Sequence, residues 1–356
     1  MTRPLIAALL LLAPAALRAG EATEASAMAS STEAAVEPSE TSTPSNLKPS
    51  FELNGDTSYV GGARTNFGSG STGTVTEERT DARAVLGVEE NDGPIYRFGL
   101  AYQRYSFGFS KASPMPDELE GEYLVAGVDF EVLNSWLVRV EADPGFYDNG
   151  RDIGFRDFNV PFEIGGSYIA SETLQWAVGL EVDINRQIPV FPAIGVRWAI
   201  NDQWVLDAIL PTPRLEYQWS KNLTLYLGGD LDDGTYRMDP GPGPARYTTT
   251  TTTVSQRKLA GYSIIPPNGP TPIYTTVTST ETKRTPVRNS PAAGSIVEYD
   301  EARIGAGLSW KAAKGVTLEM EGGYLPFREF DFHRSSVHFS NDDGAAYGQM
   351  SLNTQF

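Results

Sequence analysis

Apolar and polar residues alternate in almost every patterned segment of this chain. In residues 122–133, EYLVAGVDFEVL, every second position from Leu124 to Val132 is apolar, and the other face carries Gly127, Asp129 and Glu131. Residues 174–185, LQWAVGLEVDIN, repeat the pattern. A period of two residues is typical of a β-strand whose two faces meet different surroundings. The chain therefore predicts an all-β fold in which each strand has one apolar and one charged face.

The alternating segments are joined by connections that are short and long in turn. This arrangement predicts antiparallel neighbours linked by hairpin turns at one end and by longer loops at the other. We count about fourteen strands, with a range of about twelve to sixteen. They lie near 51–61, 77–88, 94–107, 122–133, 136–147, 158–169, 173–185, 192–200, 203–210, 213–219, 222–237, 298–310, 314–326 and 346–356.

Tryptophan positions decide what the apolar faces contact. The chain has six, each within about four residues of a short connection and on the apolar parity of its strand. A soluble β-sandwich would bury tryptophan in mid-strand, whereas indole rings prefer the interface between membrane and water. We therefore predict an aromatic girdle on the short-turn side of a membrane-spanning sheet. Its members are Trp136, Trp176, Trp198, Trp204, Trp219 and Trp310.

The last twelve residues, AAYGQMSLNTQF, follow the same rule. Met350, Leu352 and Phe356 share one parity, and polar residues from Gln349 to Gln355 share the other. Lipid cannot satisfy the backbone groups of an open sheet edge, so a sheet that spans a membrane must close on itself. We expect the last strand to pair with the first, with the apolar parity facing lipid.

The N-terminal region predicts export. A basic residue precedes an apolar stretch of signal-peptide length, so residues 1–27 are expected to be a signal peptide cleaved after Ala19 or Ala27. Residues 28–50 have little to bury and predict a disordered periplasmic leader, which leaves 51–356 for the barrel. No later segment has the ~18 consecutive apolar residues of a membrane helix.

Composition excludes several classes of protein. The chain has no cysteine, so it has neither disulfides nor thiolate metal sites. A net charge of -17 argues against nucleic acid as a partner, because phosphates would be repelled. The sequence indicates no cofactor.

These features together resemble bacterial outer-membrane β-barrels. The resemblance implies a transmembrane, antiparallel up-and-down barrel with both chain ends in the periplasm, surrounded by membrane lipid and lipopolysaccharide. It also implies that Phe356 is a signal read by the outer-membrane assembly machinery. Residues 157–230 resemble a family of outer-membrane barrels to which no function is assigned, so this narrower resemblance implies a fold and no activity.

Charged residues dominate the positions predicted to face inward. Acids outnumber arginines there by about three to one, and such a lumen would concentrate cations and repel anions. The same charges would also brace the wall by pairing across strands, and neither role excludes the other. If residues 133–135 form a three-residue turn, Asp129 lies opposite Arg139. The predicted lumen-lining residues are Asp129, Glu131, Arg139, Glu141, Asp143, Glu181, Asp183, Arg303, Glu319 and Glu321.

A long extracellular insert is predicted at 239–297. It is basic in an acidic chain and contains two similar Thr-rich stretches with strand propensity but no apolar face. We expect a hairpin above the membrane whose basic residues contact lipopolysaccharide phosphates. The alternative is that the insert folds into the lumen as a constriction. The basic residues are Arg246, Arg257, Lys258, Lys283, Arg284 and Arg288.

Catalytic and metal-binding patterns are weak. His333 and His338 lie near serines and acids, but nothing indicates a strained nucleophile turn or an oxyanion donor, so we expect no enzyme activity. Two histidines five positions apart in a loop impose no ligand geometry, and we expect no metal site. The acids near Asp230 and Asp232 lack the spacing of the helical calcium motif, so a solvated loop entrance is the favoured interpretation.

The sequence therefore predicts a porin-like transport protein of the outer membrane of Gram-negative bacteria. The favoured function is a passive channel for small solutes or cations through an acidic lumen, because about fourteen strands should enclose more than a side-chain-filled core. The alternative is a structural or adhesive barrel that displays its long insert and has a lumen plugged by it.

Overall fold

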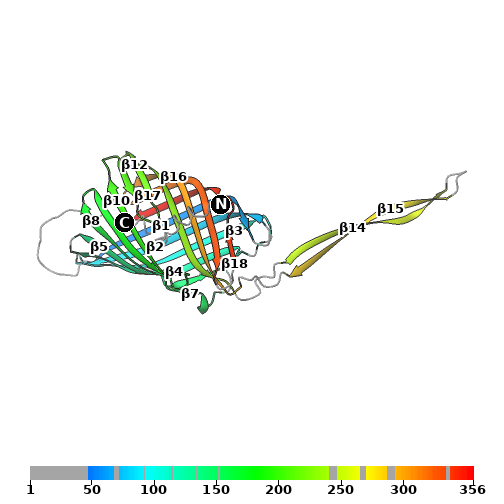
Figure 1. Cartoon of the computed structure of the whole chain (residues 1–356), viewed down its shortest axis with the longest axis horizontal. Helices are drawn as coiled ribbons and strands as arrows, with labels where there is room; N and C mark the ends of the chain where they lie inside the picture. The colour runs from blue at the N-terminus through cyan, green and yellow to red at the C-terminus, as the bar shows by residue number, and fades with distance from the viewer. Residues whose placement is uncertain are drawn as a thin grey trace, which may run out of the picture.

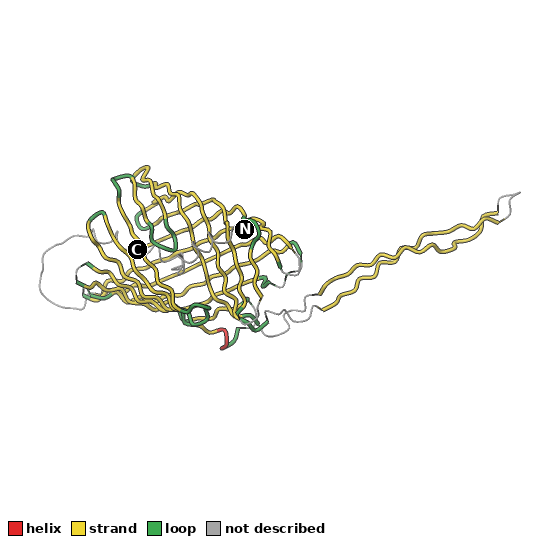
Figure 2. The backbone as a smooth tube through the Cα atoms, in the orientation of Figure 1, coloured by secondary structure: helices red, strands yellow, loops and turns green. Residues whose placement is uncertain are grey.

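The structure is a computed structural model, and it describes residues 47–67, 72–91, 93–111, 113, 115–133, 135–150, 153–239, 247–264, 270–286, 293–333 and 337–356. The predicted signal peptide and all but the last four residues of the predicted leader lie outside the described residues. None of the described helices has the length and apolarity needed to cross a membrane. The one assigned helical segment in this part of the chain is a single 3-10 turn, Phe155–Asp157, drawn in red in Figure 2.

The chain forms a closed antiparallel barrel of fourteen strands, as predicted. Three barrel positions are each built from two consecutive segments, namely β5 with β6, β7 with β8, and β18 with β19. The barrel segments are β1 (Leu47–Asn66), β2 (Thr72–Glu90), β3 (Ile95–Phe109), β4 (Glu118–Val132), β5 (Trp136–Ala142), β6 (Gly145–Asp148), β7 (Phe158–Asn159), β8 (Phe162–Ser171), β9 (Leu174–Val182), β10 (Val190–Ala199), β11 (Trp204–Asp207), β12 (Arg214–Ser220), β13 (Leu223–Arg237), β16 (Ile296–Ala313), β17 (Val316–Phe332), β18 (Val337–Ser340) and β19 (Ala345–Gln355).

Proline explains two of the divided positions. The sequence predicts one strand at 136–147 and one at 158–169, but Pro144 separates β5 from β6 and Pro161 separates β7 from β8. Proline has no N–H to donate to a ladder, so it interrupts regular pairing. The carbonyl groups still take part, because Pro144 O accepts from Leu124 N at 3.0 Å and Pro161 O accepts from Asp143 N at 2.9 Å.

The last strand closes the barrel against the first. β1 and β19 pair in continuous register from Glu52–Gln355 to Val60–Tyr347. Phe51 and Phe356 exchange two backbone hydrogen bonds of 2.9 Å at the end of this seam. The expected alternation is confirmed. Met350, Leu352 and Phe356 are exposed on the outer face, while Gln349 Nε2 and Ser351 Oγ donate inward to Asp56 Oδ2 at 2.8 Å and 2.6 Å.

The barrel wall is taller on one side than on the other. We call the end with the short connections the turn end and the opposite end the loop end. β1 to β4, β13, β16 and β17 have 15 to 20 residues, whereas β8 to β12 have 4 to 10. The long strands therefore extend at the loop end beyond the short ones. The first strand also starts earlier than expected, since Leu47 to Ser50 pair with β2.

The outer surface of the tall side has two zones. Toward the turn end, β3 and β4 expose apolar side chains such as Phe98, Leu100 and Leu124. Toward the loop end, the same outer parity carries polar residues, and Arg104 on β3 is paired in register with Glu120 on β4. The change falls at the same height on both strands, because Leu100 pairs with Leu124. We call the two zones the apolar belt and the polar collar.

The predicted insert forms a separate two-stranded sheet of β14 (Tyr247–Ile264) and β15 (Pro270–Pro286). Figure 1 shows this hairpin projecting away from the barrel rather than folding into it. Its base is closed by hydrogen bonds from Met238 N to Ser295 O at 2.9 Å and from Gly294 N to Asp239 O at 3.2 Å. The expected hairpin is present, and the alternative of a constriction inside the lumen differs from the arrangement observed.

Candidate functional site: the barrel interior

The interior of the barrel carries an unusual density of buried charge. Among the described residues, thirteen Asp and Glu side chains and six Arg side chains are buried. The acid excess is therefore nearer two to one than the predicted three to one. Much of the difference comes from arginines that the sequence analysis did not assign to the interior: Arg79, Arg186 and Arg328.

The predicted pair of Asp129 and Arg139 is confirmed. The two residues are directly opposite in the register of β4 and β5. Arg139 donates from Nε to Asp129 Oδ1 and from Nη2 to Asp129 Oδ2, both at 2.7 Å. A two-pronged contact of this kind fixes both side chains against the inner wall. Arg97 on β3 lies 3.7 Å from the same carboxylate.

Most other predicted lumen residues are held by partners. Glu141 accepts from Arg83 at 2.5 Å, and Glu319 accepts from Arg214 at 3.0 Å. Arg303 is fully buried, Glu321 contacts Tyr347, and Glu131 is exposed near the turn end. These pairs show the bracing role that the sequence left open beside cation selectivity. Asp143, Glu181 and Asp183 are also buried.

The loop between β9 and β10 adds a charge that the parity argument missed. Arg186 is buried and lies against Glu181 at 3.2 Å and against Asp233. Burial opposes the charged form, yet Asp233 and Glu181 raise the pKa of the Arg186 guanidinium above its usual value, so it stays charged. Asp183 in the same loop accepts from Thr235 at 2.6 Å. The loop is thereby fixed to the wall at β13.

Two clusters of ion pairs cross the lumen, and we call them together the ionic layer. In the first, Glu77 on β2 contacts Arg303 on β16 at 3.0 Å and Arg328 on β17 at 2.8 Å, with Glu301 beside both arginines. The hydroxyl of Tyr299 lies 2.6 Å from the Glu77 carboxylate. The four charged side chains are between 0% and 2% exposed, so they are shielded from bulk solvent.

The second cluster of the ionic layer joins β2 and β3 to β13. Arg79 donates to Asp81 on its own strand and to Asp232 on β13, and the hydroxyl of Tyr105 on β3 donates to the same Asp232 carboxylate. Asp232 therefore lies in a strand and inside the barrel. The interpretation of the acids near it as a solvated loop entrance is wrong, because β13 continues as far as Arg237.

An aromatic layer lies beside the ionic layer toward the loop end. Phe330 on β17 contacts Phe107 on β3 at 5.0 Å and Tyr299 on β16 at 4.8 Å between ring centroids. Tyr299 also contacts Tyr105 at 4.9 Å, and Tyr105 contacts Tyr236 on β13 at 6.2 Å. These rings belong to a cluster of buried apolar side chains that includes Phe332 and Phe339. The loop-end half of the barrel thus has a hydrophobic core.

Both layers join opposite walls of the barrel. Tyr236 on β13 donates to Gln103 on β3 at 2.8 Å, and the backbones of β13 and β6 are bridged at Arg237 and Asp148. In the closed strand order, β13 is separated from β3 and from β6 by several intervening strands in either direction. The barrel is therefore flattened at this level, and we call the ionic and aromatic layers together the seal.

The sequence of β3 carries a signal for the seal. On β3 the apolar residues change parity. Phe98 and Leu100 face outward, whereas Tyr105 and Phe107 are buried on the parity of Arg97. A change of apolar parity along a strand indicates that the apolar surroundings move from outside to inside the sheet. The identity of the partners across the lumen has no such local signal.

A cavity lies next to the seal. Its lining includes the carboxylates of Asp56, Asp81, Asp230 and Glu319 together with three guanidinium groups. Those are supplied by Arg79, Arg83 and Arg214. The four carboxylates in its wall exceed the three cationic groups by one.

The tryptophans lie at the turn end, as their positions in the strands require. Five of the six are exposed on the outer surface, and Trp136 is half-buried against Tyr168 with ring centroids 5.2 Å apart. Trp204 contacts Tyr217 at 4.9 Å, and Tyr217 contacts Trp219 at 6.3 Å. Indoles and phenols therefore form contacts along one rim of the barrel. The five exposed tryptophans are Trp176, Trp198, Trp204, Trp219 and Trp310.

The two histidines lie outside the seal, on the polar collar. His333 Nε2 is 2.8 Å from Glu298 Oε2, and His338 Nδ1 is 2.9 Å from Glu329 Oε1. The sequence predicts a loop over 327–344, but β17 continues to Phe332 and β18 forms from Val337 to Ser340. Ser335 and Ser336 lie outside the described residues.

Comparisons with known proteins find similarity only among solved structures. No family model matches the sequence, and no curated protein matches it either. The resemblance of 157–230 to a barrel family therefore stays a prediction.

Among solved structures, the chain is similar to the toluene transporter TodX of Pseudomonas putida, at 10% identity and a TM-score of 0.37, covering 86% of this chain and 89% of that one. It is also similar to an outer membrane channel from Pseudomonas putida F1, at 9% identity and a TM-score of 0.38, covering 90% and 100%. A NanC porin gives 9% identity and a TM-score of 0.32, covering 85% and 98%. Likenesses at this level carry no argument about activity.

Proposed function

We propose that the chain is an outer-membrane β-barrel that provides a cation-preferring passage for small solutes, and that the seal closes this passage in the state described. The observation that carries the proposal is a closed fourteen-strand barrel with an apolar belt outside and an acid-rich, buried charge network inside. The proposal extends to lipid and lipopolysaccharide as its surroundings and to Phe356 as its assembly signal.

The outer surface supports the membrane part of the proposal. Exposing the apolar belt to water would cost free energy, whereas contact with lipid avoids that cost. On β4 the outer parity is apolar from Leu124 to Val132, which is about 26 Å along the strand and about 20 Å along the barrel axis once strand tilt is included, close to the ~25 Å band of outer-membrane barrels. The exposed tryptophans lie at one rim of this band, where aromatic residues anchor barrels to the interface.

The interior supports the preference for cations. Carboxylates exceed arginines both in the whole buried set and in the wall of the cavity beside the seal. A low-dielectric wall with one sign of excess charge raises the local concentration of the opposite ion by about tenfold or more. Small cations are therefore favoured over anions wherever water enters the barrel.

The seal defines the state of the passage. Glu77, Arg303 and Arg328 are buried from bulk solvent, and the aromatic layer covers them toward the loop end. Conduction requires these side chains to separate. The proposed passage is therefore gated by its own wall and differs from the open passive channel that the sequence predicted.

A planar-bilayer experiment tests the proposal. We expect purified wild-type protein to open rarely and the double variant Phe107→Ala/Phe330→Ala to open at least about tenfold more often, because truncating two touching rings removes the centre of the aromatic layer. In a potassium chloride gradient the reversal potential should shift toward the potassium equilibrium potential. The matched control is Phe98→Ala, which removes a ring from the outer face of the same strand as Phe107.

A second function is favoured by one specific observation. The β14–β15 hairpin projects away from a barrel whose loop-end interior is filled, which is the arrangement expected of a barrel that displays a surface element. A display barrel remains silent in both the wild-type protein and the seal variant. A seal variant that folds, as judged by heat-modifiable gel mobility, and stays silent would favour display over conduction.

A further inference from the structure

Both histidines of the chain lie at one place on the polar collar. The sequence has two histidines in 356 residues, one directly after the end of β17 and one in β18. Pairing of β17 with β18 sets His338 directly opposite Asp331, and Glu329 lies two residues before Asp331 on the same face of β17. The strand pairing therefore supplies the ligand geometry that a loop would lack.

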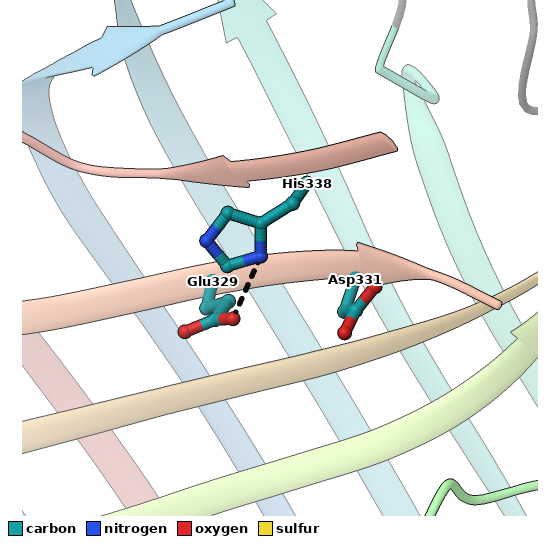
Figure 3. Close-up of side chains that lie close together, drawn as sticks. All are labelled: Glu329, Asp331 and His338. Carbon is teal, nitrogen blue, oxygen red and sulfur yellow. Dashed lines mark ion pairs between the residues drawn. The ribbon is translucent and has the colours of Figure 1, made fainter. Parts of the chain in front are cut away.

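The three side chains converge on one point outside the barrel wall. Figure 3 shows Glu329 and Asp331 from β17 and His338 from β18 on the same face of the sheet. One donor atom from each residue lies within 4.8 Å of the other two. His338 Nδ1 and Glu329 Oε1 are 2.9 Å apart. Their neighbours Phe330 and Phe332 point the other way, into the hydrophobic core, and hold β17 rigid at this position.

We propose that Glu329, Asp331 and His338 bind a divalent transition-metal ion of the Zn²⁺ class. Four-coordinate zinc with bonds of about 2.1 Å places its donor atoms about 3.4 Å apart, so the observed separations need only small side-chain rotations. His338 is 52% exposed and is therefore free to rotate. One imidazole with two carboxylates is a mixed nitrogen and oxygen set that suits zinc better than calcium, which prefers six to eight oxygens.

Neighbouring groups orient the ligands. Gln187 in the β9–β10 loop donates from Nε2 to Asp331 Oδ2 at 2.5 Å and from its backbone N to Glu298 Oε2 at 3.2 Å. Glu298 is paired in register with Asp331. Outer-shell contacts of this kind fix the ligating atoms and sustain metal affinity. Three outer carboxylates in one patch also attract cations before they bind.

The ion would join β17 and β18, which follow one another in the chain. β18 is a four-residue segment that pairs with β17. A bond from the metal to each strand adds a link to this short pairing. Zn²⁺ should therefore stabilise the loop end as well as bind there, which gives a readout independent of conduction.

Zinc titration of the full chain folded in detergent tests the proposal. Competition with a chromophoric chelator should show one saturable site per chain, and Zn²⁺ should raise the thermal unfolding temperature. His338→Ala should weaken the affinity by about tenfold or more, because it removes the only nitrogen ligand. Glu329→Gln and Asp331→Asn should each weaken it in the same direction.

His333→Ala is the matched control, since it removes the chain's other histidine from a neighbouring carboxylate. It should keep the wild-type affinity within about threefold, as expected for a residue outside the ligand set. Heat-modifiable mobility shows that each variant has folded. Absence of a saturable site in the wild-type protein overturns the proposal. Equal affinity in wild type and His338→Ala, or an equal loss in His333→Ala, overturns this ligand set.

Discussion

At the scale of single residues, Glu77 has the most demanding environment in the barrel. Its carboxylate is completely buried and contacts two arginines and a tyrosine hydroxyl from β16 and β17. Charges removed from water are tolerated only when their partners are complete. The network therefore fixes the geometry of the flattened loop end, because no member is replaceable without leaving another charge uncompensated.

Replacing Glu77 with Gln should destabilise the protein by about 3–5 kcal/mol, the range seen when one partner of a buried ion pair is removed. The physical reason is that Arg328 would keep only the more distant Glu301 carboxylate, at 3.9 Å. Urea unfolding followed by tryptophan fluorescence measures the change. Glu131→Gln, on an exposed acid, should stay within about 0.5 kcal/mol of wild type. Equal stability of the two variants would show that the ionic layer does not hold the fold.

At the scale of the element, β3 shows how one strand serves two environments. Its turn-end half exposes Phe98 and Leu100 outward, and its loop-end half buries Tyr105 and Phe107 inward. The outer residues beyond Leu100 become polar, beginning with Arg104. One strand thus presents apolar side chains outward in its turn-end half. In its loop-end half it presents them inward, as the wall of a hydrophobic core does. Under the proposed function, the change from the apolar to the polar outer surface marks the edge of the lipid.

Arginine substitutions on the outer face of β3 should locate that edge. Phe98→Arg should cost about 2–4 kcal/mol, the cost of a cationic side chain near the bilayer midplane. Ser106→Arg, on the same face but in the polar collar between Glu78 and Glu118, should cost about nothing or be slightly favourable. Unfolding in lipid vesicles measures both. Similar costs at the two positions would mean that the belt and the collar face the same medium.

The strands were largely predictable because the alternation of apolar and polar residues lies within each strand. Each of the fourteen predicted strands is found, and the seam between first and last strands follows from the parity of Met350 and Leu352. β18 was missed because four residues around His338 are too few to show a period. The seal was missed for a different reason. The partners of Glu77 lie more than 200 positions away, and alternation within a strand does not encode contacts across a lumen.

At the scale of the whole molecule, the seal and the hairpin are independent parts. The seal is made by inward-facing side chains of β2, β3, β13, β16 and β17, and each of these strands belongs to the barrel sheet. The hairpin forms its own sheet and projects from the loop end. Closure of the interior therefore does not depend on the hairpin, contrary to the expectation of a lumen plugged by the long insert.

Deleting the hairpin should leave both conductance and stability unchanged. Hydrogen bonds between Met238 and Ser295 and between Asp239 and Gly294 already close its base, so two glycines in place of residues 240–293 can join β13 to β16. We expect the shortened protein to open as rarely as wild type in a planar bilayer and to keep heat-modifiable mobility. Adding Phe107→Ala/Phe330→Ala to the deletion should raise the opening frequency as much as it does in the full chain. Stepwise openings produced by the deletion alone would assign closure to the insert and remove the seal from its proposed role as the gate.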